Sequence, residues 1–115
     1  MQLEAVKFML MAQDMTRGVA FYRDVFGLET GYVSEHWSEL KHGDAVVALH
    51  GGGDGSFRAT GLSFQVADIE AACAEVLAGG GAIRKQPEAR PGEPIKLADA
   101  TDPEGNGFML TEYVG

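Results

Sequence analysis

The chain has 115 residues, of which 45% are hydrophobic and 23% charged, a composition typical of one globular domain with a single core. Its formal net charge of −8 argues against a nucleic-acid partner, which would need clustered Lys and Arg side chains. No segment approaches the roughly 20 apolar residues of a membrane span, and we expect no signal peptide. The single cysteine, Cys73, excludes an intramolecular disulfide and favours a cytoplasmic location.

The first half of the chain predicts a strand, a helix and three further strands. Residues 4–12 are almost continuously apolar and indicate a strand. Asp14 is placed to cap a helix, whose apolar stripe is formed by Met15, Val19, Tyr22 and Phe26. Gly27 is placed to end this helix. The remaining strands are expected near 28–33, 35–41 and 45–50, with a hairpin turn at His42-Gly43-Asp44.

The second half repeats this order. The glycine-rich run GGGDGS, at 51–56, indicates a linker of about 51–59 between modules of about 1–50 and 60–115. Asp68 takes the place of Asp14, and the apolar stripe of the second helix is formed by Ile69, Ala72, Cys73 and Val76. Gly79-Gly80-Gly81 ends that helix. The strands are expected near 60–67, 82–86, 95–100 and 107–113, with a Pro-rich loop after the second and a DPEGN turn before the last.

Two βαβββ modules, with helices on one face of the strands and an open face opposite, predict a single α+β domain. Strand parity then assigns the side chains to faces. The uniformly apolar parity should meet the helices and comprises Val6, Phe8, Leu10, Val47, Leu49, Leu62, Phe64, Val66, Phe108 and Leu110. The mixed parity should line a concave face and comprises Lys7, Met9, Met11, Val46, Ala48, His50, Gly61, Ser63, Gln65, Met109 and Thr111.

The segments FYRDVFGL, at 21–28, and DPEGN, at 102–106, together with the duplication, resemble the vicinal-oxygen-chelate superfamily. This group holds glyoxalase I, extradiol dioxygenases, fosfomycin-resistance enzymes, methylmalonyl-CoA epimerase and bleomycin-resistance proteins. The resemblance covers nearly the whole chain. It implies sheets that curl into a partly open barrel, usually completed by a second subunit, so a homodimer is expected. It does not by itself select a reaction.

Metal enzymes that resemble this chain hold their ion with His and Glu side chains on four strands. The motifs place those positions at Lys7, Ala48, Gly61 and Met109. None is a normal ligand for Zn²⁺, Ni²⁺, Mn²⁺ or Fe²⁺, because these ions prefer imidazole and carboxylate groups. A shift of one residue does not restore a ligand at any position. The resemblance therefore implies a member of the superfamily without its usual metal.

Other segments mimic functional motifs but have simpler structural interpretations. His36 and His42 lie at or near a turn and favour surface roles, whereas His50 has concave parity and is the best candidate for a histidine that contacts a ligand. Cys73 on an apolar stripe is typical of a buried structural thiol. Residues 102–112 partly mimic a calcium loop, but Glu112 is one position short of the required spacing, so a turn is expected. GGGDGS lacks the Lys and Ser/Thr of a phosphate-binding loop.

The predicted ligand-binding residues line the concave face: Lys7, Met9, Met11, Trp37, Glu39, Ala48, His50, Gly61, Ser63 and Met109. Trp37 and Glu39 share a strand face and would offer a ring beside a carboxylate, which suits a planar or cationic ligand. Alternatively, Trp37 packs at a dimer interface. Lys7 is an anion anchor, a base if its pKa is depressed, or the partner of Glu39 in an ion pair.

These patterns favour a small-molecule-binding protein similar in type to bleomycin-resistance proteins, with no metal or other cofactor and with a pocket at a dimer interface. Antibiotic resistance is one role of such a protein. The alternative is an enzyme of the lyase or isomerase type that uses Lys7, Glu39 and His50 as acid–base groups. A metal-dependent glyoxalase or dioxygenase is a third hypothesis, for which about one transition metal per subunit would be the signature.

Overall fold

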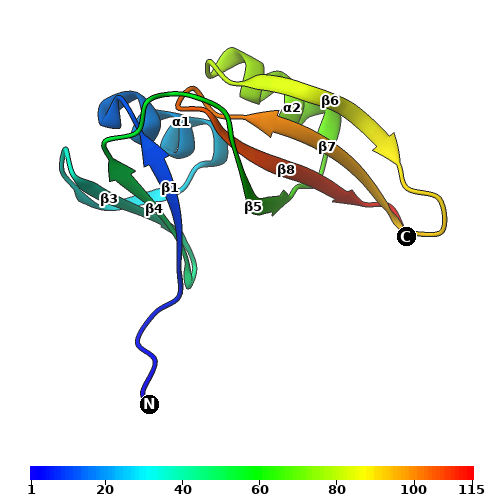
Figure 1. Cartoon of the computed structure of the whole chain (residues 1–115). Coiled ribbons are helices and arrows are strands. Elements are labelled where there is room, and N and C mark those ends of the chain that lie inside the picture. The colour runs from blue at the N-terminus through cyan, green and yellow to red at the C-terminus, as the bar shows by residue number, and fades with distance from the viewer.

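The computed structural model describes all residues, 1–115, and contains the two predicted βαβββ modules in succession (Figure 1). The first module consists of β1 (Lys7–Ala12), α1 (Met15–Phe26), β2 (Glu29–Val33), β3 (Trp37–His42) and β4 (Ala45–Gly51). The second consists of β5 (Arg58–Gln65), α2 (Ile69–Ala78), β6 (Ala82–Ala89), β7 (Ile95–Thr101) and β8 (Asn106–Tyr113).

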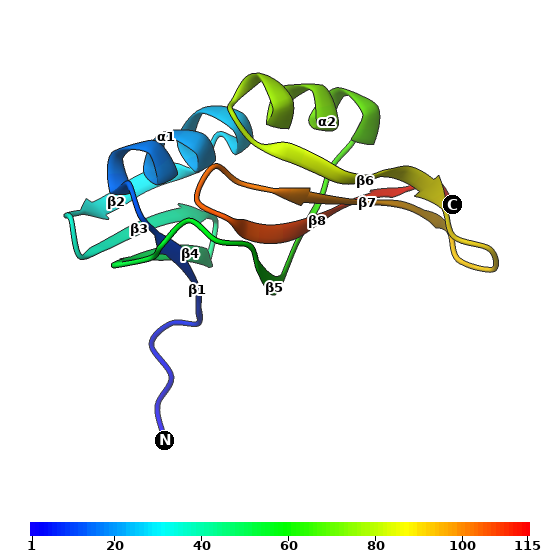
Figure 2. The ribbon, with the colours of Figure 1, turned by 45° about the horizontal axis from the view of Figure 1, so that its top comes forward.

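Each module forms its own four-stranded sheet, in the order β1-β4-β3-β2 and β5-β8-β7-β6. The first and last strands of each module, β1 with β4 and β5 with β8, pair in parallel, and the other pairs are antiparallel. Both helices lie on the same side of the sheets (Figure 2). The α+β fold is thus confirmed. Within one chain the two sheets do not close into a barrel, because no strand of one sheet pairs with a strand of the other.

Several predicted strand boundaries are wrong, including the beginning of β3, which lies at Trp37 rather than at residue 35. β1 begins at Lys7 rather than at residue 4, because its pairing with β4 starts there. β5 begins at Arg58 rather than at residue 60, and the Arg58 N–H donates to the Gly105 carbonyl. β6 continues through Pro87 to Ala89, into the expected Pro-rich loop. An edge strand tolerates proline because one side of it donates no ladder hydrogen bonds.

Both helices begin at the predicted aspartate caps but end differently. The Asp14 and Asp68 side chains accept hydrogen bonds from the backbone N–H groups of Arg17 and Ala71. Gly27 ends α1 in the left-handed conformation, with φ of 67°. Gly79 ends α2 with φ of −84°, so its backbone does not need glycine. A Cβ there would lie 2.4 Å from a methyl of Val25, so close packing against α1 requires glycine.

One core of 18 buried residues joins the two modules. The aromatic residues of α1 carry this junction: Phe26 stacks on Phe64 of β5 with ring centroids 4.0 Å apart, and Phe21 packs on Phe108 of β8. The segment FYRDVFGL therefore packs against the second module as well as its own sheet. No helix in the structure is both long and apolar enough to cross a membrane.

Burial confirms most of the helix-facing parity. The buried members of that set are Leu10, Val47, Leu49, Leu62, Phe108 and Leu110. The prediction is wrong for Val6 and Phe8, which are 73% and 36% exposed. Val6 precedes β1, and helix α1 packs against β2, β3 and β4, so it leaves Phe8 near the beginning of β1 uncovered.

The DPEGN turn ties the modules together through buried polar side chains. Asp102 accepts hydrogen bonds from the Tyr22 hydroxyl at 2.6 Å and from the backbone N–H groups of Glu104 and Asn106. The Asn106 side-chain amide donates to the Met11 carbonyl and accepts from the Met11 N–H. It therefore makes with β1 the two hydrogen bonds that a neighbouring strand would make. All of these groups are satisfied within the protein, and the segment forms the predicted turn.

The Glu104 side chain extends the same network to the beginning of α1. It accepts hydrogen bonds from the backbone N–H groups of Gln13 and Asp14 and from the Arg17 side chain. Burial raises the pKa of the neighbouring Asp102 carboxyl, although its hydrogen bonds from Tyr22 and Asn106 act in the opposite direction. The network therefore connects the β7–β8 turn of the second module to the β1–α1 junction of the first.

Candidate functional site

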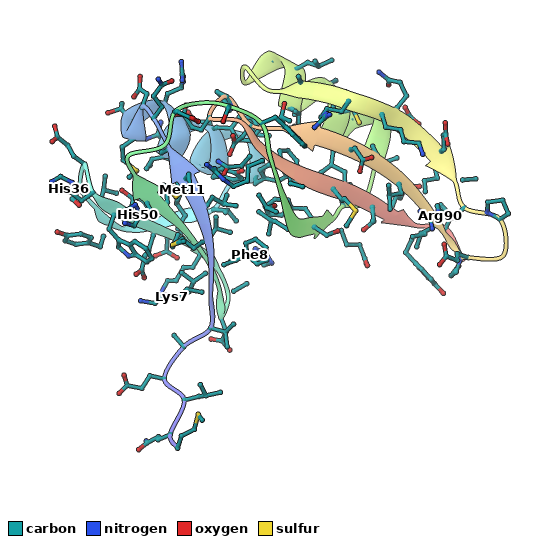
Figure 3. The ribbon with its side chains drawn as sticks, in the orientation of Figure 1. Lys7, Phe8, Met11, His36, His50 and Arg90 are labelled. Atoms are coloured by element: carbon teal, nitrogen blue, oxygen red, sulfur yellow. The ribbon has the colours of Figure 1, made fainter.

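Seven of the ten predicted ligand-binding residues lie on one face of the first sheet by strand register. Lys7, Met11 and His50 of this group are labelled in Figure 3. Cross-strand register aligns Met9, Ala48 and Glu39 in one row and Met11, His50 and Trp37 in the next, with Lys7 at the beginning of β1. Ala48 is fully buried within its row, so a ligand on this face would touch its neighbours instead.

A polar triad occupies the centre of this face. Lys7 Nζ lies 2.8 Å from Glu39 Oε2, and Trp37 Nε1 donates to the same oxygen at 2.7 Å. The hydrogen bond from Lys7, followed by that from Trp37, lowers the pKa of the Glu39 carboxyl. Of the three interpretations of Lys7, the structure contains the ion pair. The Glu39 carboxylate, which the sequence suggested could bind a cationic ligand, is therefore already paired with the Lys7 ammonium group.

The histidines do not converge. His50 Nδ1 lies 2.5 Å from the Gly51 carbonyl oxygen, and the His50 ring stands nearly perpendicular to that of Trp37, with centroids 6.2 Å apart. His36 is exposed on the same side of the molecule. His42 lies at the end of β3 and lines a groove between the two modules. No three His, Cys, Asp or Glu side chains come together in a geometry that could hold a metal ion.

The other predicted residues, Gly61, Ser63 and Met109, lie on the second sheet. Gly61 and Met109 line a pocket of about 560 Å³, which none of the seven residues of the first sheet enters. Ser63 pairs with Met109 in register but lines a neighbouring groove. In the single chain, the predicted concave site is therefore divided into two faces, one on each sheet.

The groove beside Ser63 lies between the two modules and was not predicted. It has a volume of about 520 Å³ and is mainly apolar, with walls that include Phe8 from β1, Phe26 from α1 and Phe64 from β5. Phe8 points from β1 toward β5 (Figure 3). The parity of β1 does not reveal this groove, because parity indicates a face and not which element covers it.

The residues at the four positions predicted for a metal do not fit a metal ion. Lys7 is paired with Glu39, Ala48 is buried without a donor atom, Gly61 has no side chain, and Met109 presents a half-buried thioether. Thioether sulfur is a soft ligand, poorly matched to the ions that imidazole and carboxylate groups bind. Cys73 lies elsewhere, in the core, where burial and the nearby Glu70 raise the pKa of its thiol.

Comparison with known proteins establishes the family. The family model described as the Glyoxalase/Bleomycin resistance protein/Dioxygenase superfamily matches residues 5–110. The chain belongs to this superfamily. None of the curated proteins matches it significantly.

Solved structures of superfamily proteins share this fold. A glyoxalase/bleomycin resistance protein/dioxygenase family enzyme from Burkholderia phytofirmans superposes with a TM-score of 0.79 at 19% identity, over 93% of this chain and 96% of that one. The fosfomycin resistance protein FosX from Listeria monocytogenes gives 0.79 at 16% identity, over 97% and 94%. FosX from Mesorhizobium loti gives 0.74 at 19%, over 97% and 93%. At these identities the likeness extends to the fold alone.

Four side chains that line the pocket on the second sheet, three of them charged, were not predicted from the sequence. Phe57 precedes β5, Arg84 and Lys85 follow each other on β6, and Asp99 lies on β7. Consecutive residues of a regular strand point to opposite faces, so parity does not place Arg84 and Lys85 together. They share the pocket because the pairing of β6 with β7 is irregular at this point.

Proposed function

We propose that this superfamily member binds a small organic molecule on its concave surface without the superfamily's metal ion. One observation carries the proposal: Gly61 and Met109, which the resemblance places at two of the four metal positions, line a pocket of about 560 Å³ and offer it no imidazole or carboxylate group. That volume lies within the range of small-molecule sites.

The proposal includes a second subunit and a cytoplasmic location. In one chain the faces of the two sheets do not meet, so a homodimer would be needed to place both sets of residues around one ligand. The exposed apolar side chains of Phe8 and Met9 on β1, an edge strand of the first sheet, support such an association. Sedimentation velocity over a hundredfold range of concentration tests it, and a monomer throughout would contradict the dimer.

The binding proposal is tested by metal content together with ligand titration. Elemental analysis of protein purified without chelators should show far less than one transition metal per subunit. Calorimetric titration should then detect binding within a panel of fosfomycin, glycopeptides of the bleomycin type and flat aromatic compounds, and added Zn²⁺ or Mn²⁺ should not change the affinity. One bound metal per subunit, or no binding across the panel, would contradict the proposal.

The enzyme hypothesis receives less support. Lys7 and Glu39 neutralise each other, and the lowered pKa of Glu39 keeps this carboxylate ionised at neutral pH. A general acid or base works best with a pKa near the operating pH. If an isomerase or lyase activity is found, Lys7→Gln and His50→Gln should abolish it under this hypothesis, and unchanged turnover in both variants would exclude these two groups.

A further inference from the structure

The second-sheet pocket has a charge opposite to that of the protein as a whole. Its charged lining side chains are Arg84, Lys85 and Asp99, which leaves one excess positive charge in a chain of net charge −8. Phe57, Leu62 and Met109 contribute apolar surface. This inference rests on the proposed function, because it identifies the kind of ligand that the same pocket would bind.

Two irregularities in strand pairing shape this pocket. Along β5, two extra residues, Thr60 and Gly61, lie between the pairs Ala59–Gly107 and Leu62–Phe108. Along β6, one extra residue, Arg84, lies between Ile83–Ala100 and Lys85–Asp99. Both bulges border the pocket, and bulges commonly redirect side chains beside binding sites. The bulge on β6 accounts for two consecutive cations that line one pocket.

Arg84 is held in place without being neutralised. Its guanidinium carbon lies 3.5 Å from the centre of the Phe57 ring, whereas the ion pairs of the chain all involve other cations. Stacking on a ring occupies one face of the guanidinium plane and leaves the N–H donors at its edge free. Lys85 contacts Glu88 only at 3.8 Å, with both side chains more than half exposed, so this pair is weak.

Gly107 allows this arrangement. A Cβ at Gly107 would lie 2.8 Å from the Phe57 ring, so the absence of a side chain lets the ring lie over β8. Arg84 and Phe57 come from opposite edges of the sheet, β6 and the segment before β5, and meet across its face. The guanidinium group is therefore positioned by residues from three separate parts of the second module.

We propose that this pocket binds a small organic anion, with its carboxylate or phosphate on Arg84 and Lys85 and its apolar part against Phe57 and Met109. The planar fork of arginine donors matches the oxygen atoms of both groups. Asp99, beside Lys85 in register, opposes the anion and limits its affinity. The expected ligand is thus opposite in charge to the cation that Trp37 and Glu39 suggested.

Probes of one shape and different charge test the proposal. Benzoate, phenyl phosphate, benzamide and benzylamine are titrated at equal ionic strength into uniformly ¹⁵N-labelled protein, and the amide resonances of Thr60, Gly61 and Arg84 are followed. Benzoate or phenyl phosphate should bind at least about tenfold more tightly than benzamide, because charge-assisted hydrogen bonds are stronger than neutral ones. Their relative affinities distinguish a carboxylate site from a phosphate site.

Three variants locate the interaction. Arg84→Gln should weaken binding of the preferred anion about tenfold and leave benzamide unchanged. Arg90→Gln is the matched control, because Arg90 is also exposed but lies at the far end of the β6–β7 hairpin, paired with Glu93 (Figure 3). Asp99→Asn should tighten anion binding severalfold. The same spectra show whether each variant is folded.

The outcomes separate this inference from the proposed function. If benzamide or benzylamine shifts the pocket resonances with an affinity equal to that of the anions, anion recognition is wrong but small-molecule binding stands. Unchanged anion affinity in Arg84→Gln also overturns the inference. If no probe shifts these resonances at millimolar concentration, both the anion site and ligand binding in this pocket are wrong.

Discussion

The two modules have the same order of elements but open faces of different character. On the first sheet the charges of Lys7 and Glu39 neutralise each other, and Trp37 also donates to Glu39. Strand β1 pairs with β4 without interruption. On the second sheet the equivalent pairing of β5 with β8 contains a bulge, and Arg84 is without a carboxylate partner. The duplicated backbone thus supplies a frame, and local register decides whether a face is satisfied or available to a ligand.

The β3–β4 and β7–β8 turns differ in the same way. Asp44 in the first is exposed and forms no buried network, whereas Asp102 in the second is almost fully buried and holds the modules together. The β7–β8 turn therefore provides the polar junction between the modules, whereas the β3–β4 turn is exposed to solvent. The following four experiments test this asymmetry, beginning with the largest expected effect.

The turn asymmetry predicts the largest difference. Asp102→Ala should lower the free energy of unfolding by about 3–5 kcal/mol, because the Tyr22 hydroxyl and the N–H donors around the turn lose a buried acceptor. Asp44→Ala should change it by less than about 0.5 kcal/mol. Urea unfolding at constant m-value measures both, and equal losses would mean that the two turns are equivalent.

The second prediction concerns Tyr22 of α1. When the two modules are aligned at Asp14 and Asp68, the corresponding residue of α2 is Val76, which has no hydroxyl group. Tyr22→Phe should destabilise the protein at pH 7 by about 1–3 kcal/mol, since Asp102 loses a buried donor. Burial, and then the Asp102 charge, raise the pKa of Tyr22 well above 10.0. Above pH 10 the unfolded chain releases this proton and the folded chain retains it, so the stability of the natural protein falls as the pH rises.

The difference between the natural protein and Tyr22→Phe should therefore shrink above pH 10, by up to about 1.4 kcal/mol per pH unit. Unfolding curves of both proteins between pH 7 and 11 measure it. Tyr32→Phe, at an exposed position, is the control. A constant difference would mean that the Tyr22 hydroxyl titrates normally in the folded protein.

The third prediction compares the helix ends. Gly79→Ala should cost about 1–3 kcal/mol because its Cβ would overlap Val25, and adding Val25→Ala should recover part of that loss relative to Val25→Ala alone. Gly27→Ala should cost about 1–2 kcal/mol through its left-handed backbone, with no coupling to Val25. Double-mutant cycles in urea distinguish the two causes. Coupling of equal size at both glycines would remove the distinction.

The smallest effect concerns the triad of the first sheet. Lys7→Gln should change the free energy of unfolding by less than about 1 kcal/mol, because an accessible ion pair contributes little. It should nevertheless raise the pKa of Glu39 toward 4.5, since the bond from Lys7 is the main cause of its lowering. The fluorescence of Trp37, the single tryptophan, reports this titration. Lys41→Gln is the control, and identical titrations in all three proteins would dissociate Lys7 from Glu39.

Much of the fold follows from local patterns. Asp14 and Asp68 cap their helices as predicted, because N-capping involves residues close in sequence. The parity of β4 and β8 correctly predicts the burial of Leu49 and Leu110. Parity fails at Val6, which precedes β1, and at Phe8, near the beginning of β1, which helix α1 does not cover. The faces of a strand are thus predictable, but their coverage depends on how the helix lies over the sheet.

The sequence by itself determined the duplicated βαβββ order and the helix caps, because these depend on residue type and short-range spacing. Only the tertiary structure decided that Lys7 is paired with Glu39 and that Arg84, Lys85 and Phe57 meet around one pocket. These contacts depend on cross-strand register and on bulges. Register and bulges arise when segments distant in sequence pair and pack, so spacing along one strand does not reveal them.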